Sequence, residues 1–379
     1  MSQPSTRSLP TRLRRHVADD TRYLQIPGRF RLENGEQLED VVVAFRTWGE
    51  PDNAQSRAVL ICHALTASAD ADRWWPGMIG PGAAFDPRSD FIICSNILGS
   101  CYGTTGPASP KPGSALPYRA DFPRVSVRDM VNLQSRLLDE LGVQRLALVT
   151  GPSLGGMQAL EWAAMYPQRV AAIAPIGVGG RHSAWCIAGS EAQRAAIYAD
   201  ANWQGGYYSD DESPALGLAA ARMMGVSSYR SWQSFQQRFG REEGEDGEFQ
   251  MQSYLRFQGE KFVERFDANC YVRLTQAMNT HDLARDRGPY FDVLEGIKQP
   301  VLVVSVSSDT LYPPREQQLL ATHLPAARYR VLDSDDGHDG FLIKTGPLGA
   351  MVREFRAALR AEQPALATDR ALELIPVPG

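Results

Sequence analysis

The sequence contains 379 residues, of which 43% are hydrophobic and 22% are charged, and it has a net charge of −5 with a pI near 5.8. This composition is typical of a globular chain long enough for one large core and an inserted subdomain. The acidic balance argues against a nucleic-acid partner, and no apolar stretch approaches the roughly 18 residues that a membrane span needs. The start of the chain lacks the apolar segment of a secretory signal, so we expect a cytoplasmic protein.

The cysteines are scattered through the sequence without the C-x-x-C spacing of metal or redox sites. We expect them to be reduced thiols, with no disulfide framework and no metal site. They are Cys62, Cys94, Cys101, Cys186 and Cys270.

The first half of the chain alternates between predicted strands and helices, which is the pattern of a mostly parallel, doubly wound α/β sheet. Residues 29–45 predict a β-hairpin that turns at Asn34-Gly35. Aliphatic and β-branched runs predict buried strands at 57–62, 91–96, 145–150 and 170–176. Helical periodicity predicts helices at 127–141 and 157–166.

The sequence changes character between about His182 and Arg287, where no run has the pattern of a buried strand. Helices are predicted there at 191–200, 215–224, 232–239 and 262–278. Strand character returns at 300–306 and again at 329–332. We therefore predict a sheet domain formed by 20–181 and 296–362, interrupted by a helical lid over 182–295, with tails at 1–19 and 363–379.

The segment Gly151-Pro-Ser153-Leu-Gly155 fits G-x-S-x-G between a predicted strand and a predicted helix. Such a turn holds a serine hydroxyl clear of the backbone, and small residues on either side are needed where backbone segments pack closely. The helix that follows points its positive N-terminal end at the serine. An ordinary tight turn is the alternative, because the pattern alone is degenerate. We interpret the segment as a nucleophile elbow with Ser153 as the nucleophile.

Two further residues follow predicted strands in the order that a serine hydrolase triad requires. Asp309 comes just after 300–306, and His338 lies in a glycine-flanked loop after 329–332. Asp309 as a helix cap and His338 as a solvated loop residue are the alternatives. The chain order Ser153, Asp309, His338 is that of α/β-hydrolases rather than of trypsin-like or subtilisin-like enzymes.

Several ordered motifs, spread over about residues 22–358, resemble those of homoserine O-acetyltransferases. Besides the elbow, they are His63-Ala-Leu-Thr66, Trp74–Gly82, Asn96–Pro107, Phe122–Asp129, Asn202–Tyr208, Gly217–Arg222, Ser253–Gly259, Arg265–Asn269 and Gly337–Phe341. The resemblance implies an α/β-hydrolase fold with a helical lid that also forms a homodimer. One departure lies in the elbow, where Pro152 and Leu154 stand in place of the family's usual glycine and methionine.

The resemblance also implies roles for individual residues. The backbone N–H groups of Leu65 and Leu154 would form the oxyanion hole, beside a triad of Ser153, Asp309 and His338. Homoserine would be bound by the residues Arg222 and Asp339, with Tyr229 and Thr66 as further contacts. An α-amino acid needs a cation for its carboxylate and an anion for its ammonium group, which Arg222 and Asp339 supply.

The implied reaction transfers an acetyl group from acetyl-CoA to L-homoserine through an acetyl-serine intermediate, in methionine biosynthesis. Acetyl-CoA is a co-substrate, and no cofactor or metal is expected. Serine as acceptor, or succinyl-CoA as donor, are alternatives on the same scaffold, because one methylene changes discrimination by only about 1–3 kcal/mol. An esterase or thioesterase, and a non-catalytic binding protein of the same fold, are further alternatives.

Overall fold

The computed structural model describes residues 10–51, 57–245 and 247–362. Its centre is an eight-stranded sheet in the order β1-β4-β6-β5-β7-β8-β9-β10. The antiparallel pairs involve β1 and β4, and the remaining neighbours run parallel. The strands are β1 Arg22–Gln25, β4 Val42–Trp48, β5 Ala58–Ile61, β6 Phe91–Ser95, β7 Leu148–Pro152, β8 Ile173–Ile176, β9 Val301–Val306 and β10 Ala327–Leu332. This is the mostly parallel, doubly wound sheet that the sequence predicts.

Alternate residues of the central strands enter two separate hydrophobic clusters, one on each face of the sheet. Leu60 belongs to one cluster, whereas its neighbours Val59 and Ile61 belong to the other. Because successive side chains of a strand point to opposite faces, both faces are covered by helices. One face carries α3 Val127–Glu140, α4 Leu154–Met165, α10 Tyr290–Gly296 and α11 Pro314–His323, and the other carries α2 Ala71–Trp74, α12 Gly340–Ile343 and α13 Thr345–Glu362.

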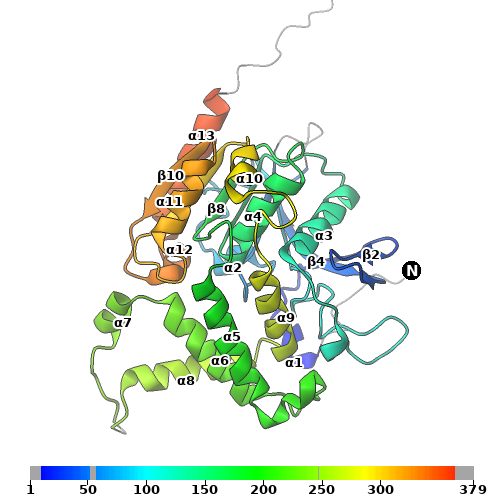
Figure 1. The fold of residues 1–379 in the computed structure, drawn as a ribbon, viewed down its shortest axis with the longest axis vertical. Coiled ribbons are helices and arrows are strands. Elements are labelled where there is room, and N and C mark those ends of the chain that lie inside the picture. The colour runs from blue at the N-terminus through cyan, green and yellow to red at the C-terminus, as the bar shows by residue number, and fades with distance from the viewer. Residues whose placement is uncertain (1–9, 52–56, 246, 363–379) are drawn as a thin grey trace, which may run out of the picture.

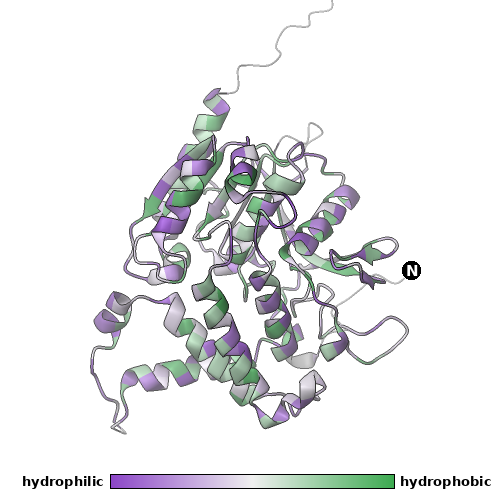
Figure 2. Cartoon of the chain, viewed as in Figure 1, coloured by the Kyte–Doolittle hydropathy of each residue, from purple (hydrophilic) through white to green (hydrophobic). Residues whose placement is uncertain are grey.

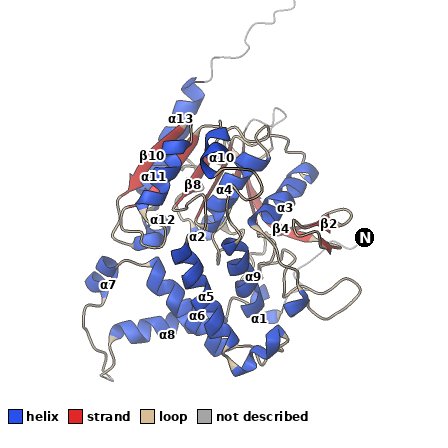
Figure 3. Ribbon diagram, viewed as in Figure 1, coloured by secondary structure: helices blue, strands red, loops and turns tan. Residues whose placement is uncertain are grey.

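The described chain between β8 and β9 forms helices without a further strand, apart from isolated bridges (Figure 3). Figure 1 shows α5 to α8 gathered on one side of the sheet domain, as the predicted lid requires. The lid helices are α5 Ala184–Tyr198, η3 Ala201–Gly206, α6 Ala215–Tyr229, α7 Trp232–Arg238, α8 Gln250–Val263 and α9 Ala268–Asn279. Helix α10 follows them but contacts α11 of the sheet domain, so the last part of the predicted lid packs on the sheet.

Several predicted elements are wrong in detail. The helices predicted at 191–200 and 215–224 are parts of the longer helices α5 and α6. The hairpin predicted at 29–45 is a two-residue pair, β2 Phe30–Arg31 with β3 Gln37–Leu38, and residues from Val42 onward instead join the main sheet as β4. The positive φ of 52° at Asp40 marks the turn that separates them. The single helix predicted at 262–278 is broken, because Asp267 accepts a hydrogen bond from the Cys270 N–H and starts α9 as a new helix.

The described part of the predicted N-terminal tail packs on the core. Leu13, in the short helix α1 Thr11–Arg14, is fully buried and belongs to the larger hydrophobic cluster. Residues 1–9 of that tail, and the tail predicted at 363–379, lie outside the described residues. Among the described residues, no helix combines the length and apolarity of a membrane span, and no three His, Cys, Asp or Glu side chains lie close enough to hold a metal ion.

Buried charges join the end of the lid segment to the helix behind Ser153. Glu161 of α4 is 1% exposed and accepts hydrogen bonds from Arg128 of α3, at 3.3 Å, and from Arg287, at 2.6 Å. Arg128 also pairs with Glu33 at 2.9 Å. Removal of Glu161 would leave Arg287 without an ion-pair partner among the described residues, while Arg128 would keep Glu33.

We expect Glu161→Ala to lower the free energy of unfolding by about 3–5 kcal/mol, because the partly buried Arg287 loses its carboxylate partner and the buried Arg128 loses one of two. The matched control is Glu39→Ala, which breaks an ion pair with Arg29 in which both side chains are more than half exposed. The control is expected to change stability by less than about 1 kcal/mol. Urea unfolding followed by circular dichroism measures both values, and equal losses would contradict the assignment.

Candidate active site

Ser153 occupies a strained turn between β7 and α4. Its φ of 55° and ψ of −122° lie outside the regions that ordinary residues adopt. A Cβ on Gly151 would lie 2.2 Å from the carbonyl oxygen of Cys62, and one on Gly155 would lie 2.0 Å from the same atom. Helix α4 begins at Leu154, three residues earlier than predicted, so its N-terminus lies directly at Ser153. The turn therefore has the geometry that the G-x-S-x-G pattern predicts.

Asp309 and His338 meet at the carboxyl ends of β9 and β10. The Nδ1 atom of His338 lies 2.6 Å from Oδ2 of Asp309, and each residue is 3% exposed. The other carboxylate oxygen, Oδ1, accepts the backbone N–H groups of Leu311 and Tyr312 at 2.9 Å. The carboxylate is thus held from two sides, and it does not cap α11, whose N-cap residue is Pro313.

The free ring nitrogen of His338 faces the cavity that Ser153 also lines. This Nε2 atom has no hydrogen-bond partner among the described residues, so the structure brings Ser153 and His338 to one cavity without joining them by a hydrogen bond. Catalytic hydrogen bonds are often long before substrate binds. The ring of Tyr312 packs at 5.2 Å from the ring of His338 and supports it from behind.

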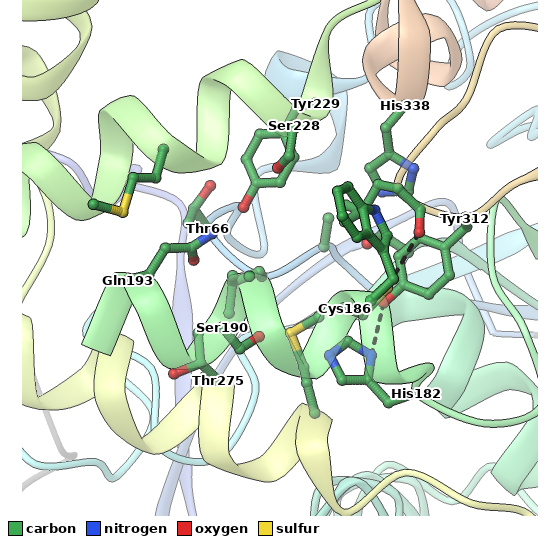
Figure 4. Close-up of a pocket in the computed structure, with 18 of the residues that line it drawn as sticks. Thr66, His182, Cys186, Ser190, Gln193, Ser228, Tyr229, Thr275, Tyr312 and His338 are labelled. Atoms are coloured by element: carbon green, nitrogen blue, oxygen red, sulfur yellow. Dashed lines mark hydrogen bonds between the residues drawn. The ribbon is translucent and has the colours of Figure 1, made fainter. Parts of the chain in front are cut away.

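The cavity has a volume of about 370 Å³ and is lined from both the sheet domain and the lid (Figure 4). It brings together most of the site residues predicted from the sequence. Those at its wall are Ser153, His338, Leu65, Thr66, Arg222, Tyr229 and Asp339. Asp309 and Leu154 are not among the residues at its wall; Asp309 lies behind His338 as its buried partner, and Leu154 directly follows Ser153 in the chain.

The loop that contains Leu65 is fixed by two residues that the sequence did not single out. His63 is fully buried, accepts the Ile97 N–H at Nε2 (3.1 Å) and contacts the Ala64 carbonyl at Nδ1 (2.8 Å). Burial lowers the pKa of His63 to about 4, so it is neutral near pH 7. Arg265 donates to the Thr66 carbonyl at 2.8 Å. Neither Leu65 nor Leu154 donates its N–H to another described residue, and Leu65 lies at the cavity wall.

An unpaired cation and an unpaired anion face the same cavity. Arg222, on α6, forms no ion pair or hydrogen bond with the described residues and lies over the rings of Phe262 (5.1 Å) and Tyr229 (5.7 Å). Asp339 likewise has no hydrogen-bond partner among them. Burial raises the pKa of Asp339 above its usual value, while the charges of His338 and Arg222 act in the opposite direction. The two charges therefore suit a ligand that has both a negative and a positive group.

An ion pair and a hydrogen bond hold the loop that contains His338 against the lid. Arg230, at the end of α6, pairs with Asp336 at 3.2 Å, and Ser231 donates to the Asp335 carbonyl. Gly337 has a φ of +68°, and a Cβ there would lie 2.7 Å from the Arg230 backbone. The sequence offers no local signal for this contact, because it joins segments about a hundred residues apart.

The chain is similar to known proteins in both sequence and fold. The chain matches the family model of the alpha/beta hydrolase fold over residues 57–345. It is 56% identical over 344 residues to a homoserine O-acetyltransferase of Trichormus variabilis, covering 90% of this chain and 96% of that protein. It is 54% identical over 343 residues to a homoserine O-acetyltransferase of Chlorobaculum tepidum, with coverage of 90% and 96%.

Solved structures resemble the whole fold, lid included. The homoserine O-acetyltransferase from Bacillus anthracis has a TM-score of 0.83 and 26% identity, covering 89% of this chain and 98% of that one. Esterase E22 has a TM-score of 0.82 and 28% identity, with coverage of 89% and 99%. Structural similarity alone relates the chain to both an esterase and a homoserine O-acetyltransferase. The two relatives of higher sequence identity named above are both homoserine O-acetyltransferases. By this sequence identity and coverage, the chain belongs to the homoserine O-acetyltransferase family of the α/β-hydrolase fold.

Proposed function

We propose that this protein transfers an acetyl group from acetyl-CoA to the hydroxyl group of L-homoserine. The observation that supports this best is the unpaired Arg222 and Asp339 at a cavity that also contains Ser153 and His338. A zwitterionic amino acid satisfies both charges, and family membership supports homoserine as that amino acid. The side chains of the site suffice for the reaction without a resident cofactor or metal. These substrates agree with a cytoplasmic location and methionine biosynthesis.

In the first half-reaction, Nε2 of His338 takes the proton of the Ser153 hydroxyl as its oxygen attacks the thioester carbonyl. The negatively charged oxygen of the tetrahedral intermediate accepts hydrogen bonds from the backbone N–H groups of Leu65 and Leu154. The C–S bond breaks, the proton on His338 passes to the sulfur, and free CoA leaves an acetyl ester on Ser153. Asp309 stabilises the positive imidazolium through its bond to Nδ1.

In the second half-reaction, homoserine binds with its carboxylate at Arg222 and its ammonium group at Asp339. His338 takes the proton of the homoserine hydroxyl, whose oxygen attacks the acetyl ester. The same two N–H groups hold the oxyanion, and Ser153 leaves with the proton returned by His338. One serine that serves two half-reactions predicts ping-pong kinetics. The lid limits access of water, which would otherwise hydrolyse the intermediate.

Hydrolysis of esters is the second candidate, because esterase E22 shares the fold at a TM-score of 0.82. Hydrolysis of an ester does not require both a cation and an anion beside the serine. The unpaired Arg222 and Asp339 therefore favour transfer to an amino acid. Succinyl-CoA as donor and serine as acceptor remain alternatives that use the same mechanism.

We expect free-thiol release from acetyl-CoA to be fast only when L-homoserine is present. Ser153→Ala is expected to lower this rate by about four orders of magnitude or more, because no acyl-enzyme can form. The assay compares acetyl-CoA and succinyl-CoA, each with homoserine, serine or no acceptor. Equal release without an acceptor would identify a thioesterase, and unchanged activity in Ser153→Ala would point to a non-catalytic triad.

We expect the affinity for homoserine to fall in mildly acidic solution. The pKa of Asp339 is raised by burial, so its charge is lost at a higher pH than the usual 3.8 of a carboxyl group, and ammonium binding is lost with it. Calorimetry of homoserine binding to Ser153→Ala protein, between about pH 4 and pH 8, measures this effect. Asp339→Asn should weaken binding by about 10–100-fold at neutral pH and flatten the pH dependence. An unchanged profile in Asp339→Asn would assign the ammonium contact elsewhere.

We also propose that two copies associate through the lid. Its helices expose large apolar side chains. Figure 2 shows green, hydrophobic stretches along α5 and α6 of the lid. They include Leu216, Trp232 and Phe257. Sedimentation velocity should show a dimer, and Leu216→Glu, at a position 82% exposed, should shift it toward monomer without unfolding the chain. The control is Leu116→Glu, 69% exposed and outside the lid, and a monomeric wild type would refute the proposal.

A further inference from the structure

One buried amide at the cavity wall has a donor with no partner. Gln193, on α5, is 7% exposed and lines the cavity, where Figure 4 shows its side chain beside Thr66. Its Oε1 atom accepts the hydroxyl of Tyr271 at 2.6 Å. No described residue accepts a hydrogen bond from its Nε2 atom. An amide N–H that faces a cavity and has no partner within the protein is available to donate to a bound molecule.

The orientation of the amide is fixed by the residue behind it. Tyr271 is 1% exposed, and its ring packs against Phe262 (5.7 Å) and Phe266 (6.1 Å). Burial raises the pKa of Tyr271 well above its usual value, so its hydroxyl keeps its proton and can donate to Oε1. With Oε1 engaged, the Nε2 side of the amide of Gln193 is directed to the cavity.

The same aromatic cluster supports the unpaired cation. Phe262, which packs on Tyr271, also lies under the guanidinium of Arg222 at 5.1 Å. The amide on α5 and the guanidinium on α6 are therefore arranged around one group of rings, and both line the cavity. A carboxylate has two oxygens with several acceptor positions, so it can bind a guanidinium and an amide together.

We propose that Gln193 determines acceptor specificity by donating a hydrogen bond from Nε2 to the carboxylate of the amino acid, beside Arg222. This inference rests on the proposed function, since it assigns a second donor to the same substrate. Tyr271 is a positioning residue that acts through Gln193. The acetyl donor reacts at the Ser153 end of the cavity and makes no use of this amide.

The decisive experiment separates the two half-reactions in Gln193→Met, which keeps the length of the side chain but removes the donor. We expect kcat/KM for homoserine to fall about 10–100-fold, mainly through KM, because a polar contact to a charged group is lost. The rate of acyl-enzyme formation from acetyl-CoA alone should change by less than about twofold. Ser228→Ala is the matched control, because its hydroxyl also faces the cavity but donates to the Gly225 carbonyl at 2.8 Å.

Charge gives a second readout. Gln193→Glu places a carboxylate against the substrate carboxylate, so it should weaken homoserine binding more than Gln193→Met does. L-Homoserinamide lacks that charge, and the variant should therefore favour homoserinamide over homoserine relative to wild type. A double-mutant cycle tests the positioning role: Tyr271→Phe should lower kcat/KM for homoserine less in Gln193→Met than in wild type, because only the part that acts through Gln193 is already lost.

Equal losses in both half-reactions of Gln193→Met would overturn the proposal, because they would indicate a general disturbance of the lid or triad. An unchanged KM for homoserine would overturn it as well. Calorimetry with homoserine and Ser153→Ala protein, with and without Gln193→Met, gives the same answer without turnover. Transfer to homoserine by the wild type tests the proposed function separately, so failure of one inference can be told from failure of the other.

Discussion

The close approach of two backbone segments at the end of the sheet is the constraint on which the site depends. The turn around Ser153 touches the carbonyl of Cys62, the residue that follows β5, and only glycine fits at Gly151 and Gly155. Because β5 and β7 are neighbouring parallel strands, their carboxyl ends open at the same edge. Ser153 and the loop at 63–66, which is the proposed oxyanion loop, are thereby placed together. The strain at Ser153 is held by packing around it.

His338, the proposed catalytic base, is held by contacts to the lid as well as to the sheet. Asp309 orients His338 from the end of β9, while Arg230 forms an ion pair with Asp336 in the loop that contains His338. The residues proposed to bind the acceptor are divided in the same way, with Arg222 on the lid and Asp339 beside His338. In that proposal the distance between lid and loop sets the span available to the amino acid, and the lid takes part in substrate recognition.

Arg222 and Asp339 have no hydrogen-bond or ion-pair partner among the described residues, which lowers the stability of the folded protein. Neighbouring groups offset part of this loss. The rings of Phe262 and Tyr229 lie under the guanidinium and stabilise it by cation–π contact. The carboxylate is stabilised by the positive charges of His338 and Arg222, which oppose the effect of burial. A site that keeps both charges ready needs no rearrangement of ion pairs when substrate binds. Preorganisation of this kind favours binding and catalysis.

The sequence by itself determined the parallel strands β5 to β10, the elbow at Ser153 and the order of the proposed triad, because these depend on short-range periodicity and turn chemistry. Local patterns misplaced the hairpin at 29–45 and the helix at 262–278, where long-range pairing and the cap at Asp267 decided the outcome. Only the tertiary structure showed that Arg265 holds the Thr66 carbonyl, 199 residues away, and that Tyr271 orients Gln193. Such contacts depend on how helices pack, and a single sequence contains no periodic signal for them.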